Sequence, residues 1–187
     1  ELTRSWPARG RAARALRCPK SGRAAQLNMG AREAAGKALL FLHADTTLPP
    51  GATRGVLRAL SDPEVIGGAF RHAFAEAGLL LSLISFWANS RSRLGVHLGD
   101  QAMFVRRSDF EEIGGFPDIP LFEDLRLSRA LRLRGRVVTL PLAAVTSARR
   151  LREAGALRMG LRYAWLEVRH VLGADPSRRK DQYPDVR

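Results

Sequence analysis

The pattern of apolar and polar residues along the chain predicts an α/β domain. Its clearest signal is Leu39–Leu42, four large apolar residues in succession that predict a strand buried on both faces, as at the centre of a parallel sheet. Pro49 and Pro50 end the polar turn that follows. Arg14–Cys18 gives a weaker strand signal. Further strands are predicted at 65–74, with a bulge or close approach at Gly67–Gly68, and at 102–105, 136–140 and 143–147.

Helical patterns alternate with these strands, which is typical of a mixed, mostly parallel sheet flanked by helices. The first predicted helix begins after a Ser21 N-cap and ends before Gly36. The helix at 77–94 is apolar and then basic, so we expect a core helix with a solvated end, contact with a membrane surface being the alternative. The helices are predicted at 22–35, 50–60, 77–94, 108–114 and 121–134, with a long amphipathic one at 150–172.

The formal net charge of +13 attracts polyanions such as nucleic acid, anionic lipid or phosphorylated small molecules. Most of the basic residues are Arg, and they are spread along the chain with local runs at 9–23, 149–152 and 178–180. An Arg bias of this kind also follows from a GC-rich coding sequence. The chain has no zinc-finger spacing, no aromatic pair on a strand and no basic helix leading into heptads, so dedicated nucleic-acid binding is disfavoured.

The length of 187 residues predicts one domain, preceded by a basic segment over residues 1–20. The single Cys18 cannot form an internal disulfide or a zinc site with a second cysteine. No stretch reaches the roughly 18 uninterrupted apolar residues that span a bilayer. We therefore expect a cytoplasmic protein, with peripheral contact at the inner face of the membrane left open.

Three places carry candidate chemistry. His43 and Asp45 follow the predicted central strand, and ligands of open α/β sheets bind at such strand ends, where a carboxylate can hold a divalent cation. Arg23 lies in the first turn of a small-residue helix, which fits either a phosphate site or close helix packing. Glu123 and Asp124 open another helix, where acids also simply complement the helix dipole.

The order of these pieces resembles a known family. Gly22–Arg23–x–x–Gln26–x–Asn28–x–Gly30, then the strand ending in His43–Ala44–Asp45, is similar to the donor-binding part of family 2 glycosyltransferases with the GT-A fold. Gly99–Asp100–Gln101, Gly114–Gly115–Phe116 and Phe122–Glu123–Asp124–Leu125 follow in the family's order. The resemblance is greatest to the bacterial radical-SAM/selenodomain-associated subgroup, through the His–Ala–Asp form, Ser147–Arg150 and Leu172–Pro176.

The resemblance implies a metal-dependent, inverting, hexosyltransferase-like enzyme that uses a nucleotide diphosphate sugar, a UDP- or GDP-sugar. The family's Asp–x–Asp metal motif falls on His43 and Asp45. A hard cation such as Mg²⁺ or Mn²⁺ prefers oxygen ligands, so Asp45 is the expected metal ligand. His43 is expected either to contact the donor or to form hydrogen bonds at the strand end.

The resemblance also assigns roles to the other residues. Asp124 would be the general base that deprotonates the acceptor hydroxyl, and Glu123 would orient it or the acceptor. Arg23, Gln26 and Asn28 would contact the donor nucleotide. Gly99, Asp100 and Gln101 would line the sugar or acceptor cleft. Arg149 and Arg150 would meet the pyrophosphate, a solvated arginine pair being the alternative.

The chain departs from the family pattern at its front, because residues 1–20 do not match the family's first strands and their uracil-binding segment. We therefore expect residues 21–187 to form a GT-A-like domain that lacks those strands, an N-terminally truncated glycosyltransferase. The alternative is a non-catalytic fragment, or a basic module that binds nucleic acid or anionic membrane. The sequence contains no Gln–x–x–Arg–Trp motif, so processive polymer synthesis is disfavoured.

Overall fold

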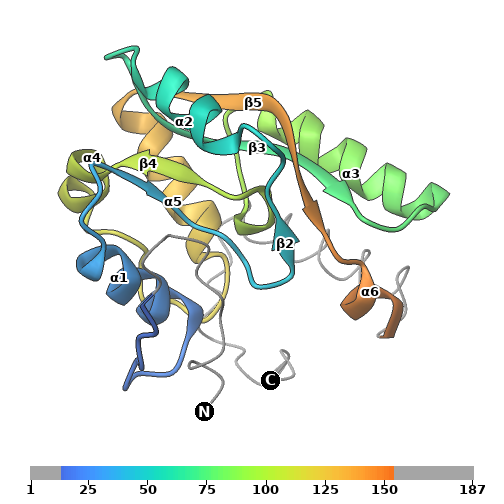
Figure 1. The fold of residues 1–187 in the computed structure, drawn as a ribbon, viewed down its shortest axis with the longest axis horizontal. Helices are drawn as coiled ribbons and strands as arrows, with labels where there is room; N and C mark the ends of the chain where they lie inside the picture. The colour runs from blue at the N-terminus through green and yellow to red at the C-terminus, as the bar shows by residue number, and fades with distance from the viewer. Residues whose placement is uncertain (1–13, 154–187) are drawn as a thin grey trace.

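The computed structural model describes residues 14–153, which form a five-stranded sheet flanked by helices (Figure 1). The strands are β1 (Ala38–Leu40), β2 (Thr46–Thr47), β3 (Val65–Phe74), β4 (Phe104–Arg106) and β5 (Arg136–Thr146). The helices are α1 (Arg23–Glu33), α2 (Ala52–Leu60), α3 (Leu79–Ser92), α4 (Arg107–Glu112), α5 (Glu123–Arg134) and α6 (Arg149–Glu153), with a 3₁₀ helix, η1, at Gly99–Gln101. The mixed α/β class expected from the sequence is confirmed.

The strand order is β1-β4-β3-β5-β2. Only β3 and β5 pair in parallel among the described strands, whereas β1–β4, β3–β4 and β2–β5 are antiparallel. The expectation of a mostly parallel sheet with Leu39–Leu42 at its centre was therefore wrong. β1 lies at an edge of the described sheet. The sequence did not indicate this position, because a short apolar run predicts a buried strand but not which strands will flank it.

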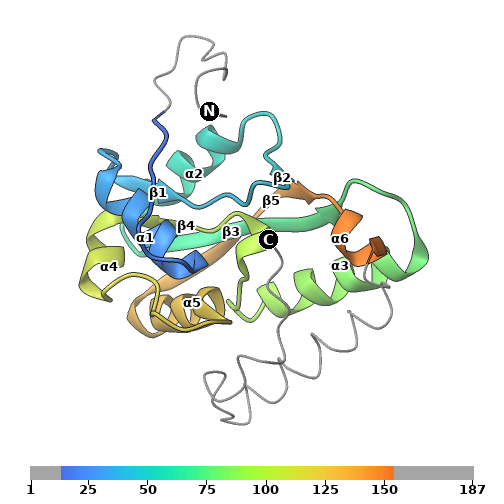
Figure 2. The same ribbon diagram turned by 90° about the horizontal axis from the view of Figure 1, so that it is seen from below.

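Two helical layers cover the sheet, as Figure 2 shows edge-on, with α2 on one face and α4 and α5 on the other. On the α2 face, Val56 and Leu60 pack with Phe70 and Phe104. On the opposite face, Phe110 of α4 and Leu127 of α5 pack with residues of β1, β3 and β4. Each face of the sheet thus has its own apolar core, which is why β3 is buried along most of its length.

Two glycines let β3 approach both of its neighbours. A Cβ on Gly68 would lie 2.0 Å from the Val138 carbonyl oxygen of β5, and one on Gly67 would lie 2.6 Å from the Phe104 carbonyl oxygen of β4. The register also shifts between Val65 and Gly67. The sequence predicted a bulge or a close approach at this pair, and the close approach is confirmed.

β5 is one strand where the sequence predicted two, at 136–140 and 143–147. Pro141 interrupts the pattern, but the strand continues past it, and the register with β3 slips so that Phe70 opposes Leu140 while Arg71 opposes Ala143. The slip accommodates the missing proline N–H without ending the strand. The long β5 therefore reaches from α5 to the short β2 at the other sheet edge.

α3 departs from the expected core helix, because apolar side chains lie on both of its faces. Leu81 and Ala88 are buried against the domain, whereas Leu79, Leu83, Phe86 and Trp87 are between 56% and 79% exposed. Among the described residues no helix combines the length and apolarity that a membrane crossing requires. Leu79, Leu83, Phe86 and Trp87 form the exposed stripe of α3.

The remaining expectations concern the ends of the described chain. Arg14–Cys18 forms no strand, contrary to the weak signal there. α1 begins after Gly22, without a side-chain cap from Ser21. The predicted helix at 150–172 is described only for its start within α6, and the rest of it lies outside the described residues.

Candidate functional site

The connection from β1 to β2 brings His43 and Asp45 across the end of the sheet. β1 lies at one edge and β2 at the other, so Phe41–Asp45 has to pass the ends of the strands between them. On this path His43 reaches η1, and the Asp45 carbonyl oxygen accepts a hydrogen bond from the Ser147 N–H at 3.0 Å. The sheet topology, and not a central strand position, thus places these residues at the sheet end.

His43, Gly99 and Asp124 converge on one point although they come from three separate segments. The Gly99 N–H donates to Asp124 Oδ2 at 2.8 Å. A Cβ on Gly99 would lie 2.5 Å from His43 Nε2 and 3.2 Å from Asp124 Oδ2. Glycine is therefore required here by close contact, and the turn gathers an imidazole and a carboxylate around it.

Asp124 is held by its own helix as well as by η1. Its Oδ1 accepts the Leu125 N–H at 2.7 Å, and the residue is 7% exposed. Two backbone N–H bonds use part of the accepting capacity of a carboxylate, which has about four lone-pair sites. The side chain therefore satisfies one N–H of the first helical turn and still has lone pairs free to accept a proton from a bound hydroxyl.

Glu123 and Arg23 form an ion pair between the first turns of α5 and α1. Glu123 is 1% exposed, whereas the Arg23 side chain is 45% exposed. The guanidinium thus compensates a buried carboxylate on one side and meets solvent on the other. Glu123, which precedes Asp124, is thus paired with Arg23. The structural role of Glu123 is to anchor α1 beside the start of α5.

One of the predicted donor contacts, Asn28, has a structural role. Asn28 donates from Nδ2 to the Phe116 carbonyl oxygen at 2.8 Å and accepts the Phe116 N–H at 2.9 Å. Both ends of its amide thus hold the Gly114–Phe116 loop against α1. Gln26, in contrast, is exposed on α1.

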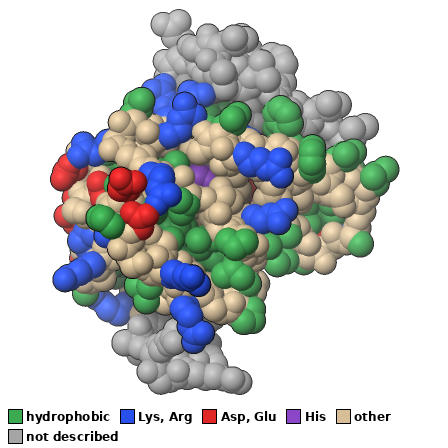
Figure 3. Space-filling model, turned by 90° about the horizontal axis from the view of Figure 1, so that it is seen from above, with side chains coloured by type: hydrophobic (Ala, Val, Ile, Leu, Met, Phe, Trp, Pro, Cys, Tyr) green, Lys and Arg blue, Asp and Glu red, His purple; other side chains and the backbone are tan. Residues whose placement is uncertain are grey.

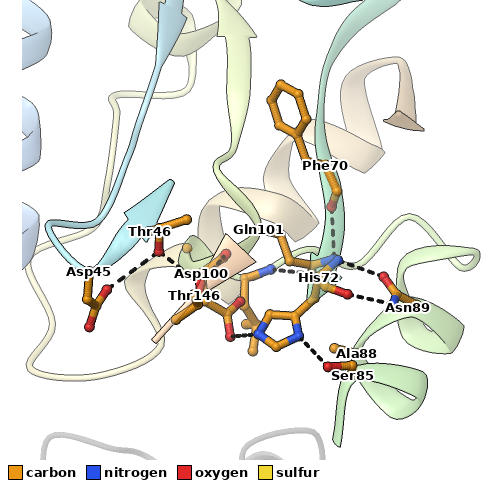
Figure 4. A network of polar contacts seen from close by, with 12 residues as sticks. Asp45, Thr46, Phe70, His72, Ser85, Ala88, Asn89, Asp100, Gln101 and Thr146 are labelled. Atoms are coloured by element: carbon orange, nitrogen blue, oxygen red, sulfur yellow. Dashed lines mark hydrogen bonds and ion pairs between the residues drawn. The ribbon is translucent and has the colours of Figure 1, made fainter. Parts of the chain in front are cut away.

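Gln101 lies in the core and not in a cleft wall. Its side chain is fully buried, donates from Nε2 to the Phe70 carbonyl oxygen and to Ser92 Oγ, and accepts the Leu98 N–H (Figure 4). It therefore fixes η1 to β3 and α3. Asp100, its neighbour, keeps a half-exposed side chain that faces His72.

A polar network joins Asp45 to Asp100 (Figure 4). Thr46 Oγ1 donates to Asp45 Oδ1 at 3.5 Å and lies 2.9 Å from Thr146 Oγ1, which in turn contacts the Asp100 carbonyl oxygen at 3.3 Å. The two buried threonines thus tie β2, β5 and η1 together beside the Asp45 carboxylate. Neither threonine was singled out by the sequence, because the contact depends on the pairing of β2 with β5.

An acidic residue that the sequence analysis did not single out, Glu76, lies in the loop after β3. Glu76 Oε2 accepts the Ala148 N–H at 2.7 Å and Oε1 accepts from Ser147 Oγ at 3.2 Å, just before α6. The Ala148 N–H in particular lowers the pKa of Glu76. Arg149 is exposed at the start of α6, and the backbone of Arg150 follows it in the helix. Glu76 therefore fixes the segment that directly precedes Arg149.

The oxygen ligands at Asp45 suit a hard divalent cation, although the described protein atoms offer few of them. Within residues 14–153, no group of three or more acidic, histidine or cysteine side chains is arranged so that it could hold a metal ion. The Asp45 carboxylate, with the Thr46 hydroxyl beside it, could supply one or two ligands. Mg²⁺ commonly takes one or two carboxylates and completes its shell with water and substrate phosphates. The residues present fit that mode of binding.

Backbone strain marks the same region. Ala102 and Phe122 have φ angles of 49° and 64°, the only non-glycine residues in the left-handed region among those described. Ala102 directly follows Gln101, and Phe122 directly precedes Glu123. Such conformations cost of order 1–3 kcal/mol and persist where the surroundings enforce them, often at functional sites.

Comparison with known proteins identifies the family. The model of Glycosyl transferase family 2 matches residues 3–112 of the 187. The chain belongs to glycosyltransferase family 2. No curated protein sequence matches it.

Among solved structures, nine chains match this glycosyltransferase domain. One is the mannosyltransferase PcManGT from Pyrobaculum calidifontis, in complex with GDP-Man and Mn²⁺, with a TM-score of 0.51 and 22% identity. The match covers 67% of this chain and 36% of the mannosyltransferase chain. At that identity the likeness shows the GT-A fold alone, and the chain spans about a third of the length of this neighbour.

Proposed function

We propose that this family 2 glycosyltransferase domain transfers a sugar from a nucleotide diphosphate sugar to an acceptor hydroxyl, with inversion at the anomeric carbon and with a divalent cation. The observation that carries the proposal is the convergence of His43, Gly99 and Asp124 at the end of the sheet. A buried carboxylate, an imidazole and a close backbone turn gather there from three distant segments. The family membership and the mannosyltransferase-like fold support the same reading.

Asp124 is the proposed general base. In the transfer the acceptor oxygen forms a bond to the anomeric carbon, and the bond from that carbon to the diphosphate oxygen breaks with its electron pair. The acceptor proton passes to Asp124, whose two backbone N–H bonds hold the carboxylate in place for it. The Arg23–Glu123 pair fixes α1 beside this carboxylate.

Asp45 is the proposed metal ligand, and Mg²⁺ or Mn²⁺ bound there would neutralise charge on the departing diphosphate. Arg23, Gln26, Arg149 and Arg150 are proposed to face the donor phosphates or nucleotide, and Asp100 the sugar. Asn28 and Gln101 are proposed to act indirectly. Asn28 binds the backbone of Phe116 in the loop beside α1, and Gln101 binds η1 to β3 and α3. The GDP-Man in the neighbouring structure supports a UDP- or GDP-sugar as donor.

Isothermal titration tests the proposal directly. The chain is titrated with GDP-mannose and with UDP-glucose, each with Mn²⁺ and with a chelator. We expect binding of one donor that depends on Mn²⁺ and is lost in Asp45→Asn. Asp109→Asn is the matched control, because Asp109 lies in the first turn of α4, outside the site. If neither donor binds in Mn²⁺, the proposal is wrong.

Peripheral contact with an anionic bilayer is a second proposal, carried by the exposed stripe of α3. Leu79, Leu83, Phe86 and Trp87 are exposed together on one face of the helix, Arg93 follows at its end, and the chain carries a net charge of +13. Figure 3 shows Lys and Arg in separate groups among apolar side chains on one face of the molecule. Proteins that bind nucleic acid typically carry a continuous basic stripe, so this face does not favour nucleic-acid binding.

Flotation with phosphatidylglycerol vesicles tests the bilayer proposal against phosphatidylcholine vesicles and duplex DNA. We expect binding to the anionic vesicles alone, and its loss in Phe86→Ser/Trp87→Ser. Leu133→Ser is the matched control, because Leu133 is an exposed apolar residue on α5. Binding that is unchanged in the double variant, or binding to DNA alone, would exclude contact through α3.

A further inference from the structure

His72 is a buried residue of β3 whose backbone is bound by a side chain of α3. Its N–H donates to Asn89 Oδ1 at 2.8 Å, and its carbonyl oxygen accepts from Asn89 Nδ2 at 2.9 Å. The residue is 3% exposed, and its ring packs edge-on against Phe74 with centroids 4.6 Å apart. The position of the imidazole is thus fixed from several sides, as Figure 4 shows.

The two ring nitrogens of His72 face different groups. Nδ1 lies 3.0 Å from Ser85 Oγ, and Nε2 lies 3.7 Å from Asp100 Oδ2. Burial lowers the pKa of His72, opposed by Asp100 and aided by Arg91, so the ring is neutral at neutral pH. A neutral ring carries one N–H, and a carboxylate only accepts. The favoured tautomer therefore has its proton on Nε2, with Nδ1 accepting from Ser85.

Asp100 makes few other side-chain contacts. Its Oδ1 is shielded from solvent and has no hydrogen-bond partner among the described residues. At 3.7 Å the contact of Oδ2 with His72 Nε2 is longer than a hydrogen bond, so the two groups interact through the attraction between a ring N–H and a carboxylate. Asp100 also follows Gly99, whose N–H holds Asp124. Asp100 thus lies in the turn whose Gly99 N–H binds the proposed base.

We propose that His72 is a positioning residue, whose Nε2–H directs the Asp100 carboxylate toward the sugar of the bound donor. The inference rests on the proposed function and adds to it a residue that touches neither donor nor acceptor. It predicts that affinity for the donor sugar depends on the Nε2–H of His72. Removing the Nε2–H should weaken contacts to the sugar while contacts to the nucleoside diphosphate stay intact.

Two substitutions separate orientation from packing. In His72→Gln the side-chain amide reaches about as far as Nε2 and keeps a donor toward Asp100. In His72→Asn the amide reaches only as far as Nδ1, so the contact with Ser85 is kept and that with Asp100 is lost. Both variants remove the same ring from the core, so a merely structural role would affect them alike.

Isothermal titration in Mn²⁺ compares GDP-mannose with GDP for the wild type and both variants. We expect His72→Asn to bind GDP-mannose about fivefold more weakly, within the range for one polar contact, and GDP as the wild type does. His72→Gln should recover most of that loss. In an Asp100→Asn background, His72→Asn should have no further effect on GDP-mannose.

Imidazole ¹H–¹⁵N NMR of the unsubstituted chain reads the tautomer without depending on a donor or on a folded variant. A proton on Nε2 supports the inference. A proton on Nδ1, or an equal loss of affinity in both variants, overturns it. If the wild type binds neither GDP-mannose nor GDP, the proposed function fails and with it the role in sugar binding. The tautomer would then still decide whether His72 directs Asp100.

Discussion

The Gly99 N–H donates to Asp124 Oδ2 at 2.8 Å and so joins the turn after α3 to the first turn of α5. A Cβ at the same glycine would meet His43, from the segment between β1 and β2. The three segments of the candidate site thus meet at a residue without a side chain. The first two predictions follow from this contact.

Asp124→Asn should abolish most of the proposed catalysis while leaving donor binding in place. An amide cannot take the acceptor proton, so we expect turnover to fall by about 100-fold or more. The NH₂ group would also face one backbone N–H, which should lower stability by about 1–2 kcal/mol. Release of GDP from GDP-mannose measures turnover, and Asp109→Asn serves as the control. Unchanged turnover in Asp124→Asn would exclude the role as base.

Gly99→Ala should disturb the site more than a single methyl group suggests. The added Cβ would lie 2.5 Å from His43 Nε2, so the ring or the turn must shift, at a cost of about 1–3 kcal/mol in unfolding free energy. Gly30→Ala is the matched control, because nothing lies within 4 Å of its Cβ position. In α1 that change should stabilise by roughly 0.5–1 kcal/mol. Urea unfolding compares the two, and equal effects would contradict the close contact.

Arg23→Ala should leave the buried Glu123 carboxylate without its guanidinium. Losing one partner of a fully buried pair costs roughly 3–5 kcal/mol, and the exposure of Arg23 should reduce this to about 1–3 kcal/mol. Arg23→Ala/Glu123→Gln should recover part of the loss, because the orphaned charge is gone. A double variant that is less stable than Arg23→Ala in urea would argue against the charge as the cause.

His97 should make the domain less stable in mild acid. Burial lowers its pKa from 6.5 to about 4, so the unfolded chain takes up a proton at higher pH than the folded one. Stability from this group is fully present above about pH 6.5 and is lost as the pH falls toward about 4, by at most about 3 kcal/mol. Urea unfolding measured at several pH values in this range should show that the unfolding free energy depends less steeply on pH in His97→Gln than in the wild type. Equal slopes would contradict the shift.

Local patterns predicted the elements that depend on neighbouring residues. The strand at Val65–Phe74 has its predicted bounds, and the helix that ends before Gly135 runs to Arg134 as expected. The order of motifs indicated the family, which the family model confirms. The assignment to a subgroup and the departure at residues 1–20 stay predictions.

The uses of particular side chains were harder to foresee. Asn28 and Gln101 fit the family motif, yet their amides bind Phe116 and the core around Phe70. His72 lay unnoticed in a strand, because nothing near it in sequence indicates that Asp100 will face its ring. A side chain's hydrogen-bonding partners come from other segments, so its type and spacing alone do not reveal them.

By itself, the sequence determined the α/β class and most element positions. These depend on periodicity and on residues close in the chain. Only the tertiary structure decided that β1 lies at an edge, that the strand pairs are mostly antiparallel, and that His43, Gly99 and Asp124 meet. Strand pairing and contacts across the sheet join residues far apart in sequence, and they are fixed only when the whole domain packs.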